Sequence, residues 1–183
     1  LNSNYGHSEN WIQAVNLFDK RIQSKYFLPI DSLISNLSQQ GEGFPIVTIQ
    51  CALIETFAAF REGLIYNHNK PEVGGLTYEY RDSGELFVRF LNTTPIFKGI
   101  FFSIDKGGIK QDNVPFSATQ FYSQVRCGLM HETRTKGKWV INATANDNPS
   151  DKKFIKQRTK GNIIYRTLFQ IALTEYFENY KLD

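Results

Sequence analysis

An arginine and a histidine five residues apart, Arg126 and His131, carry the clearest chemical signal in the sequence. An arginine keeps its positive charge at any ordinary pH and can donate several N–H groups to a phosphate. A histidine titrates near neutral pH and can therefore accept or donate a proton. A fixed cation beside such an imidazole is suitable for holding and cleaving a phosphodiester. This chemistry requires that the fold bring both side chains to one substrate.

The two residues fall on a segment with a well-marked helix start. A capping box and a flanking hydrophobic staple are formed by Phe116, Ser117, Gln120 and Phe121. We expect the helix to run through Arg126 and to end near residues 132 and 133. On an undistorted helix, side chains five positions apart point about 140° away from each other. Gly128 and the helix end offer ways to bring Arg126 and His131 together.

The motif and its neighbours resemble a known family. Arg126, four intervening residues and His131 resemble the R-x4-6-H motif of the HEPN domain superfamily, and the run Val125 to Glu132 is similar to the VR-x-G-L-x-H words common there. Many such domains are metal-independent endoribonucleases of toxin–antitoxin, abortive-infection and CRISPR-linked systems. The likeness in residues is confined to about 117–133. It implies a cytoplasmic hydrolase that binds RNA, needs no cofactor, and forms a homodimer in which two motifs meet, with a possible antitoxin or other antiviral-defence partner.

In such a site the RNA 2′-hydroxyl would attack the adjacent phosphorus. His131 would act as base or acid, and Arg126 would stabilise charge in the transition state. Glu55, Tyr122 and Cys127 are the expected supporting residues. Glu55 lies off the apolar stripe of its own helix and can face solvent, a partner subunit or Arg126. Catalytic relatives usually carry Asn, Asp or His where this chain has Cys127, and a thiol is a poor hydrogen-bond partner.

Other interpretations of the same residues stay open. The cysteine favours a non-catalytic HEPN module that binds nucleic acid, a nucleotide or a partner protein. Cys127 and His131 are four residues apart, as a thiolate–imidazole pair would require, although spacing identifies no orienting Asn or Asp. The remaining metal-ligand types, Cys51, His7 and His68, show no zinc spacing. We expect both cysteines to be reduced thiols.

Composition indicates one packed domain spanning residues 1–183. The chain is 41% hydrophobic and contains 15 Phe and 9 Tyr, which is ample for a core. No run of about 18 uncharged apolar residues predicts a transmembrane helix, and the first residues do not have the basic and apolar regions of a signal peptide. We therefore expect a cytosolic protein.

Positive charge is concentrated after the motif. Residues 134–166 carry nine basic and two acidic residues, although the whole chain has a net charge of only +3. We expect a basic β-hairpin insertion at about 137–158, with Phe154 and Ile155 in its returning strand. Its candidate RNA contacts are Arg134, Lys136, Lys138, Trp139, Lys152, Lys153 and Lys156, with Trp139 available for base stacking. The alternative is an ordinary solvated face.

The hydrophobic pattern predicts an all-α protein in the main, a bundle of five to six helices with this hairpin as an appendage. A first helix capped by Ser8 should bury Trp11, Val15, Phe18 and Ile22 and end before Pro29. Further helices are expected at about 30–39, 45–66, 85–91 (capped by Ser83) and 162–180. The helix at 45–66 should be the central one of the bundle. Residues 67–80 should form a loop, and residues 96–115 give no clear pattern.

Overall fold

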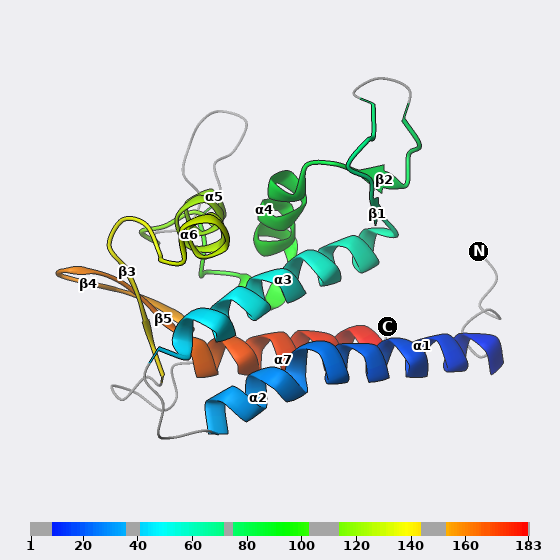
Figure 1. Ribbon diagram of the computed structural model, residues 1–183, viewed down its shortest axis with the longest axis horizontal. Helices are drawn as coiled ribbons and strands as arrows, with labels where there is room; N and C mark the ends of the chain where they lie inside the picture. The colour runs from blue at the N-terminus through cyan, green and yellow to red at the C-terminus, as the bar shows by residue number, and fades with distance from the viewer. Residues whose placement is uncertain (1–8, 36–40, 72–74, 103–113, 144–152, 183) are drawn as a thin grey trace.

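The computed structural model describes residues 9–35, 41–71, 75–102, 114–143 and 153–182, and in these ranges the protein is mainly helical, as predicted (Figure 1). The α-helices are α1 (Glu9–Ile22), α2 (Leu28–Ser35), α3 (Gly43–Glu62), α4 (Ser83–Thr93), α5 (Ala118–Phe121), α6 (Cys127–Glu132) and α7 (Arg166–Leu182). Two π-helical segments, η1 (Gln23–Phe27) and η3 (Tyr122–Arg126), join α1 to α2 and α5 to α6, and η2 (Pro95–Phe97) is a short 3-10 helix. The described strands are β1 (Ile65–Tyr66), β2 (Glu79–Tyr80), β3 (Trp139–Asn142), β4 (Ile155–Arg158) and β5 (Gly161–Tyr165).

Helix α3 is the central helix, as its long apolar pattern predicts. It lies between α1, α2 and α7 on one side and α4 with α5–α6 on the other (Figure 1). By length and composition alone α3 could cross a membrane, but its buried residues pack into the core of this fold. The predicted end near Tyr66 is too late. Gly63 adopts a left-handed φ of 63° and its N–H bonds to the carbonyls of Ala59 and Phe60, which ends the helix at Glu62.

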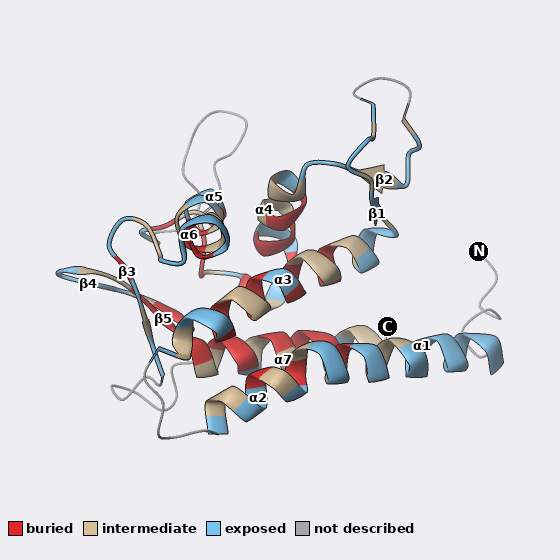
Figure 2. Cartoon of the chain, in the orientation of Figure 1, coloured by how far each residue is buried: buried red, intermediate tan, exposed pale blue. Residues whose placement is uncertain are grey.

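The first helix does not end before Pro29. It continues from α1 through η1 into α2, because the wider π turn is closed by a hydrogen bond from the Leu28 N–H to the Gln23 carbonyl just before the proline. Its predicted core-facing stripe is confirmed only at the C-terminal end. Ile22 is buried and Phe18 stacks on Phe60, whereas Trp11 is 59% exposed (Figure 2). Ser8, the predicted cap, lies outside the described residues.

The predicted β-hairpin appendage is wrong in both pairing and packing. The strand order is β3-β5-β4, with β3 parallel and β4 antiparallel to β5. The residues predicted to start the last helix form β5 instead, because Ile163, Ile164 and Tyr165 are β-favouring residues buried in a row. Phe154, just before β4, stacks on Phe169 of α7 at 4.3 Å between ring centroids. The sheet is therefore part of the core.

Smaller differences between the prediction and the structure concern the middle of the chain. The cap of α4 is Asp82 and not Ser83, since the Asp82 carboxylate accepts hydrogen bonds from the N–H groups of Gly84 and Glu85. In the segment without a clear pattern, Ile100 and Phe101 are buried, and residues 103–113 lie outside the described part of the chain. Between α3 and α4, β2 lies at the end of the predicted loop and pairs in parallel with β1, whose residues were predicted to end the central helix.

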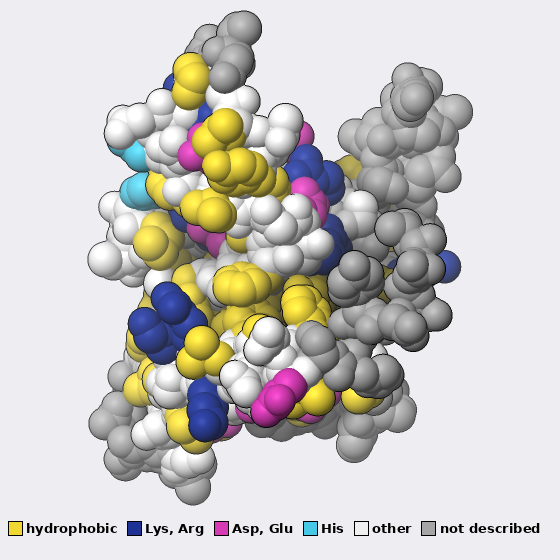
Figure 3. Space-filling view, turned by 90° about the vertical axis from the view of Figure 1, so that its right-hand side faces the viewer, with side chains coloured by type: hydrophobic (Ala, Val, Ile, Leu, Met, Phe, Trp, Pro, Cys, Tyr) yellow, Lys and Arg dark blue, Asp and Glu magenta, His cyan; other side chains and the backbone are white. Residues whose placement is uncertain are grey.

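Exposed apolar side chains gather on the β1–β2 arm. Figure 3 shows hydrophobic side chains among mixed charges on the face at this end of the molecule. The exposed large apolar residues of the arm are Ile65, Tyr66, Leu76 and Tyr78. The arm therefore adds little to the hydrophobic core. Of its described residues, only Leu64 and Tyr80, at its two ends, pack against that core.

Candidate functional site

The helix that carries the motif begins as the sequence predicts. The Ser117 hydroxyl accepts a hydrogen bond from the Gln120 N–H, and the Gln120 side chain accepts one from the Ser117 N–H, so the capping box is confirmed. After α5 the helix widens into η3 and then returns to regular α-helix in α6. It ends where Thr133 adopts a left-handed φ of 53°. Arg126 is the last residue of the π segment, a helix distortion often found at functional sites.

Gly128 does not bend the helix between the two motif residues. It is buried inside α6, where an added Cβ would lie 2.5 Å from the carbonyl oxygen of Arg134. The glycine is therefore needed so that the returning chain can pass close to the helix. Arg126 closes the π segment and His131 lies in the last turn of the regular helix α6, and on an ideal α-helix side chains five positions apart point about 140° away from each other. No hydrogen bond or ion pair joins them within the described residues.

Arg126 is held by Glu55 from the middle of α3. Its Nε donates to Glu55 Oε1 at 2.6 Å, and the two side chains are only 15% and 20% exposed. Burial opposes the charged form of Arg126, but the hydrogen bond and charge of Glu55 more than offset this and raise its pKa. Of the three environments open to Glu55 from sequence, the structure shows contact with Arg126. Since five N–H groups are available on a guanidinium, this ion pair uses only one of them.

The rest of the Arg126 guanidinium makes no hydrogen bond to a described residue. Its two terminal amino groups have no hydrogen-bond partner among the described residues, and neither is sealed from solvent. The guanidinium lies over the Tyr122 ring, 5.4 Å from the centroid. The Tyr122 hydroxyl in turn pairs with the Ser83 hydroxyl at 3.3 Å. Arg126 is thus fixed at one edge and open at the other.

Of the other two supporting positions, Tyr122 contacts Arg126 as expected, and Cys127 is a half-buried free thiol beside it. Burial raises the pKa of Tyr122, and the nearby Arg126 charge opposes this. Cys51, on α3, is buried, and burial followed by repulsion from Glu55 raises its pKa far above the usual thiol range. Both cysteines are free, as predicted. Cys51 is therefore an inert core thiol.

His131 is exposed in the last turn of α6. No side-chain hydrogen bond or ion pair involves it in the described part of the chain. An imidazole near a helix C-terminus is favoured by the helix dipole when it is protonated. Nothing within the described residues pairs it with Cys127, so the thiolate–imidazole interpretation gains no support. His131 is accessible to a substrate or to another chain.

The basic segment provides fewer free cations than its sequence suggests. Trp139 is only 4% exposed and donates its indole N–H to Gln124, so the prediction that it stacks on RNA bases is wrong. Arg134 and Lys136 both pair with Glu132. Lys138 and Lys153 are exposed, Lys156 lies 5.9 Å from the Tyr165 ring centroid, and Lys152 lies outside the described residues.

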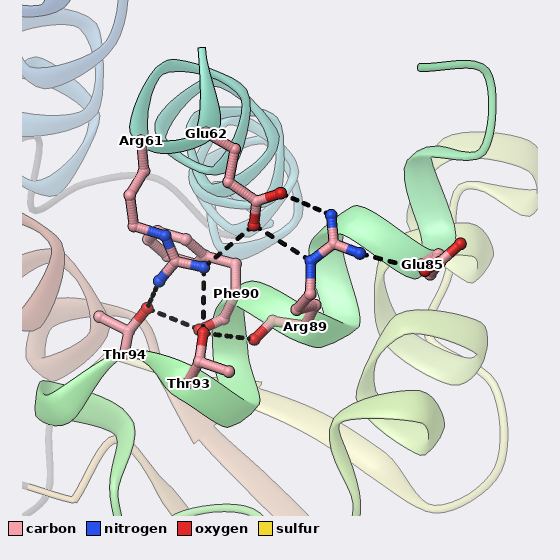
Figure 4. Close-up of polar contacts among 7 residues, drawn as sticks. All are labelled: Arg61, Glu62, Glu85, Arg89, Phe90, Thr93 and Thr94. Carbon is pink, nitrogen blue, oxygen red and sulfur yellow. Dashed lines mark hydrogen bonds and ion pairs between the residues drawn. The ribbon is translucent and has the colours of Figure 1, made fainter. Parts of the chain in front are cut away.

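A second arginine–glutamate cluster, which sequence reasoning missed, joins the end of α3 to α4 (Figure 4). Arg89 makes two hydrogen bonds to the Glu62 carboxylate and one to Glu85. Arg61 lies over the Phe90 ring and donates to the hydroxyls of Thr93 and Thr94. Two basic and two acidic residues at positions 61, 62, 85 and 89 are too ordinary a signal to identify such a cluster in advance.

Sequence reasoning also missed a hollow of about 410 Å³ that borders Glu55. Its walls come from the α1–η1 segment, α3 and β2, which are separated in the sequence, so no local pattern could indicate it. In the described part of the chain, no three His, Cys, Asp or Glu side chains are grouped so as to hold a metal ion.

Comparisons with protein-family models, with curated proteins and with solved structures find no match to this chain.

Proposed function

We propose that the protein is a metal-independent endoribonuclease of HEPN type that acts as a homodimer in the cytoplasm, in a defence or toxin–antitoxin setting. The observation that carries the proposal is the state of Arg126. Its Nε is fixed by Glu55, while both terminal amino groups have no hydrogen-bond partner among the described residues and are not completely sealed from solvent. Such an arginine is arranged to bind a phosphate group with two parallel N–H donors. The HEPN assignment and its cellular setting rest on the likeness of residues 117–133 to that motif.

The reaction would be an in-line attack of the RNA 2′-hydroxyl on its own 3′-phosphorus. The new bond joins the 2′-oxygen to phosphorus, and the bond from phosphorus to the 5′-oxygen of the next nucleotide breaks. Products are a 2′,3′-cyclic phosphate and a 5′-hydroxyl. His131 removes the 2′-hydroxyl proton or protonates the leaving oxygen. Arg126 stabilises the additional negative charge on phosphorus oxygens. The need for a 2′-hydroxyl restricts the substrate to RNA.

The lack of a hydrogen bond between Arg126 and His131 within the described residues supports a site built from two copies of the chain. On an ideal helix, the two side chains of one copy would point about 140° away from each other. A second copy that brings its own α6 alongside can place its His131 near the open edge of Arg126. The exposed Met130, next to His131, offers an apolar contact for such an approach.

A non-catalytic module is the second candidate. The observation that favours it is the Arg126–Glu55 ion pair itself, which ties α6 to α3 and gives Arg126 a structural role. Cys127 in place of a polar neighbour points the same way. Such a module would bind RNA, a nucleotide or a partner protein through the same open edge without cleaving.

The deciding experiment is cleavage of a mixed single-stranded RNA in EDTA, with end-group analysis of products. We expect 2′,3′-cyclic phosphate ends, and loss of cleavage in both Arg126→Ala and His131→Ala. His68→Ala is the matched control, because His68 is also exposed and lies outside the motif. Absence of cleavage by a folded wild-type protein that still binds RNA would favour the module.

The composite site has its own test. Arg126→Ala and His131→Ala proteins are mixed, unfolded together and refolded, and cleavage is compared with each variant alone. If each site combines Arg126 of one copy with His131 of the other, the mixed dimer contains one intact site and regains part of the activity. No recovery, with dimers present by light scattering, would place both residues of a site on one copy.

A further inference from the structure

The hollow beside Glu55 has the size and lining of a nucleobase site. It measures about 410 Å³, within the range of small-molecule sites. Its lining comes from η1 and the end of α1, one face of α3, and β2: Arg21, Ile22, Tyr26, Ala52, Glu55, Thr56, Ala59, Phe60 and Tyr80. Three of these nine residues are aromatic, and a planar base binds well against aromatic rings.

The hollow shares a wall with the proposed phosphate site. Glu55 lines the hollow, and its Oε1 accepts the hydrogen bond that fixes Arg126. A base in the hollow is therefore separated from the Arg126 guanidinium by one carboxylate. Arg21, an exposed cation of the same lining in the last turn of α1, can meet a neighbouring phosphate of the same strand.

The polar groups of the hollow favour a base that donates hydrogen bonds. Glu55 Oε2 has no partner among the described residues and is not sealed from solvent. The Thr56 hydroxyl donates to the Ala52 carbonyl, so in its 3.0 Å contact with Tyr26 the tyrosine hydroxyl is the donor. The Tyr26 oxygen then keeps its lone pairs as acceptors. Two residues of the lining thus each carry an available acceptor.

Tyr80 adds a donor. Burial, followed by repulsion from Glu55 and Tyr66, raises the pKa of its hydroxyl above the usual range, so it stays protonated at neutral pH. The Watson–Crick edge of guanine presents two neighbouring donors, N1–H and N2–H, beside one acceptor, O6. Adenine, cytosine and uracil do not combine two adjacent donors with an acceptor in this way.

We propose that this hollow binds a guanine base of the RNA, next to the phosphodiester held by Arg126. The inference rests on the proposed ribonuclease function for its substrate, but the binding of guanine can be measured without cleavage. Glu55 then has two roles: Oε1 orients Arg126, and Oε2 reads the base.

The test measures binding of 5′-GMP, 5′-AMP, 5′-CMP and 5′-UMP by NMR titration. GMP is expected to bind about tenfold or more tightly than the others, as a pair of directed hydrogen bonds allows. Shifts should centre on Tyr26, Tyr80 and Glu55. Ala52→Trp, at an exposed position on the wall, should fill the hollow and abolish this binding, whereas Ser32→Trp on the exposed face of α2 should not. Tyr80→Phe should reduce the preference for GMP over AMP.

Equal binding of all four nucleotides, or shifts elsewhere on the protein, would overturn the guanine site, and neither result depends on a variant that folds. The two proposals fail separately. RNA cleavage without guanine preference, unaffected by Ala52→Trp, would leave the ribonuclease and remove the guanine site. Localised GMP binding in a protein that never cleaves RNA would keep the guanine site and remove the ribonuclease.

Discussion

Two arginine–glutamate clusters lie along α3, and they differ in how many of their hydrogen-bonding groups the protein itself uses. At the end of the helix, Glu62 accepts from both Arg61 and Arg89, and these arginines have further partners in Glu85 and two threonines (Figure 4). In the middle of the helix, Glu55 and Arg126 share one hydrogen bond.

This difference in unused hydrogen-bonding groups separates a cluster that stabilises the fold from one that can bind a ligand. Donors and acceptors that are already satisfied cannot bind a ligand without losing a partner, which costs free energy. The terminal amino groups of Arg126 and the second carboxylate oxygen of Glu55 have no partner among the described residues, and Glu55 borders the hollow. Burial alone does not make this distinction, because Glu62 and Glu55 are similarly exposed, at 26% and 20%.

The largest difference between the two clusters should appear in RNA cleavage when Arg126 and Arg89 are each replaced with lysine. Arg126→Lys keeps the charge but loses the planar pair of donors, and we expect cleavage to fall by about 10²-fold or more. Arg89→Lys should change cleavage by less than about twofold, because its contacts are internal to the protein. Initial rates in chelator at saturating RNA measure both. Equal losses in the two variants would remove the functional difference between the clusters.

A smaller effect is expected for Glu55→Gln. The amide oxygen can still accept from Arg126, but the ion pair is lost and the guanidinium is less firmly oriented. We expect a fall of roughly tenfold in the cleavage rate, since imprecise positioning slows chemistry. If Glu55→Gln cleaves as wild type does, Glu55 does not orient Arg126 for the reaction.

The sequence predicted the motif helix more accurately than the surroundings of its residues. The start at Ser117 and the end near Thr133 depend on local backbone hydrogen bonds, which a short pattern encodes. The contact between Glu55 and Arg126 joins positions 71 residues apart, and only the packing of α6 on α3 selects it from three alternatives. The role of Gly128 likewise depends on a chain segment that returns after the helix.

Errors in the fold arose where two patterns compete. Residues 162–165 continue the four-residue spacing of α7, yet they form a strand because β3 and β4 both pair with them. Trp139 follows a basic segment and resembles an RNA contact in sequence, but the aromatic core around Phe116 and Phe121 encloses it. Long-range packing decided both cases, and no local signal reports it.

Glu62→Gln tests the satisfied cluster through pH. The hydrogen bond from Arg89 holds the pKa of Glu62 below its usual range. A carboxylate with a lowered pKa in the folded state stabilises the protein above its unfolded pKa, and that contribution is lost as pH falls through the folded value. We expect Glu62→Gln to lower the free energy of unfolding by about 1 kcal/mol at pH 7, as for a partly exposed network. The difference from wild type should begin to shrink below about pH 4, near the unfolded pKa of a glutamate, and disappear as the pH falls through the lower folded pKa.

Urea unfolding across pH 3–8 measures this difference, with cleavage assayed alongside at pH 7. Cleavage should be unchanged in Glu62→Gln. A stability difference that persists at low pH would show that the substitution acts through packing and not through the charge of Glu62.

The smallest expected effect concerns Lys138, an exposed cation just after the motif helix that lies outside both clusters. Binding of single-stranded RNA weakens with salt in proportion to the number of phosphates neutralised, with a slope of about −0.7 per contact. Lys138→Ala should make the logarithmic salt slope shallower by about 0.7 and weaken binding uniformly across sequences. Lys20→Ala is the matched control, an exposed lysine on α1, which lies on the other side of α3 from α6 (Figure 1).

Fluorescence anisotropy between 50 and 300 mM salt, roughly the range in which such slopes are linear, measures both variants. Equal slopes for Lys138→Ala and wild type would mean that RNA reaches the open edge of Arg126 without crossing the segment that follows His131.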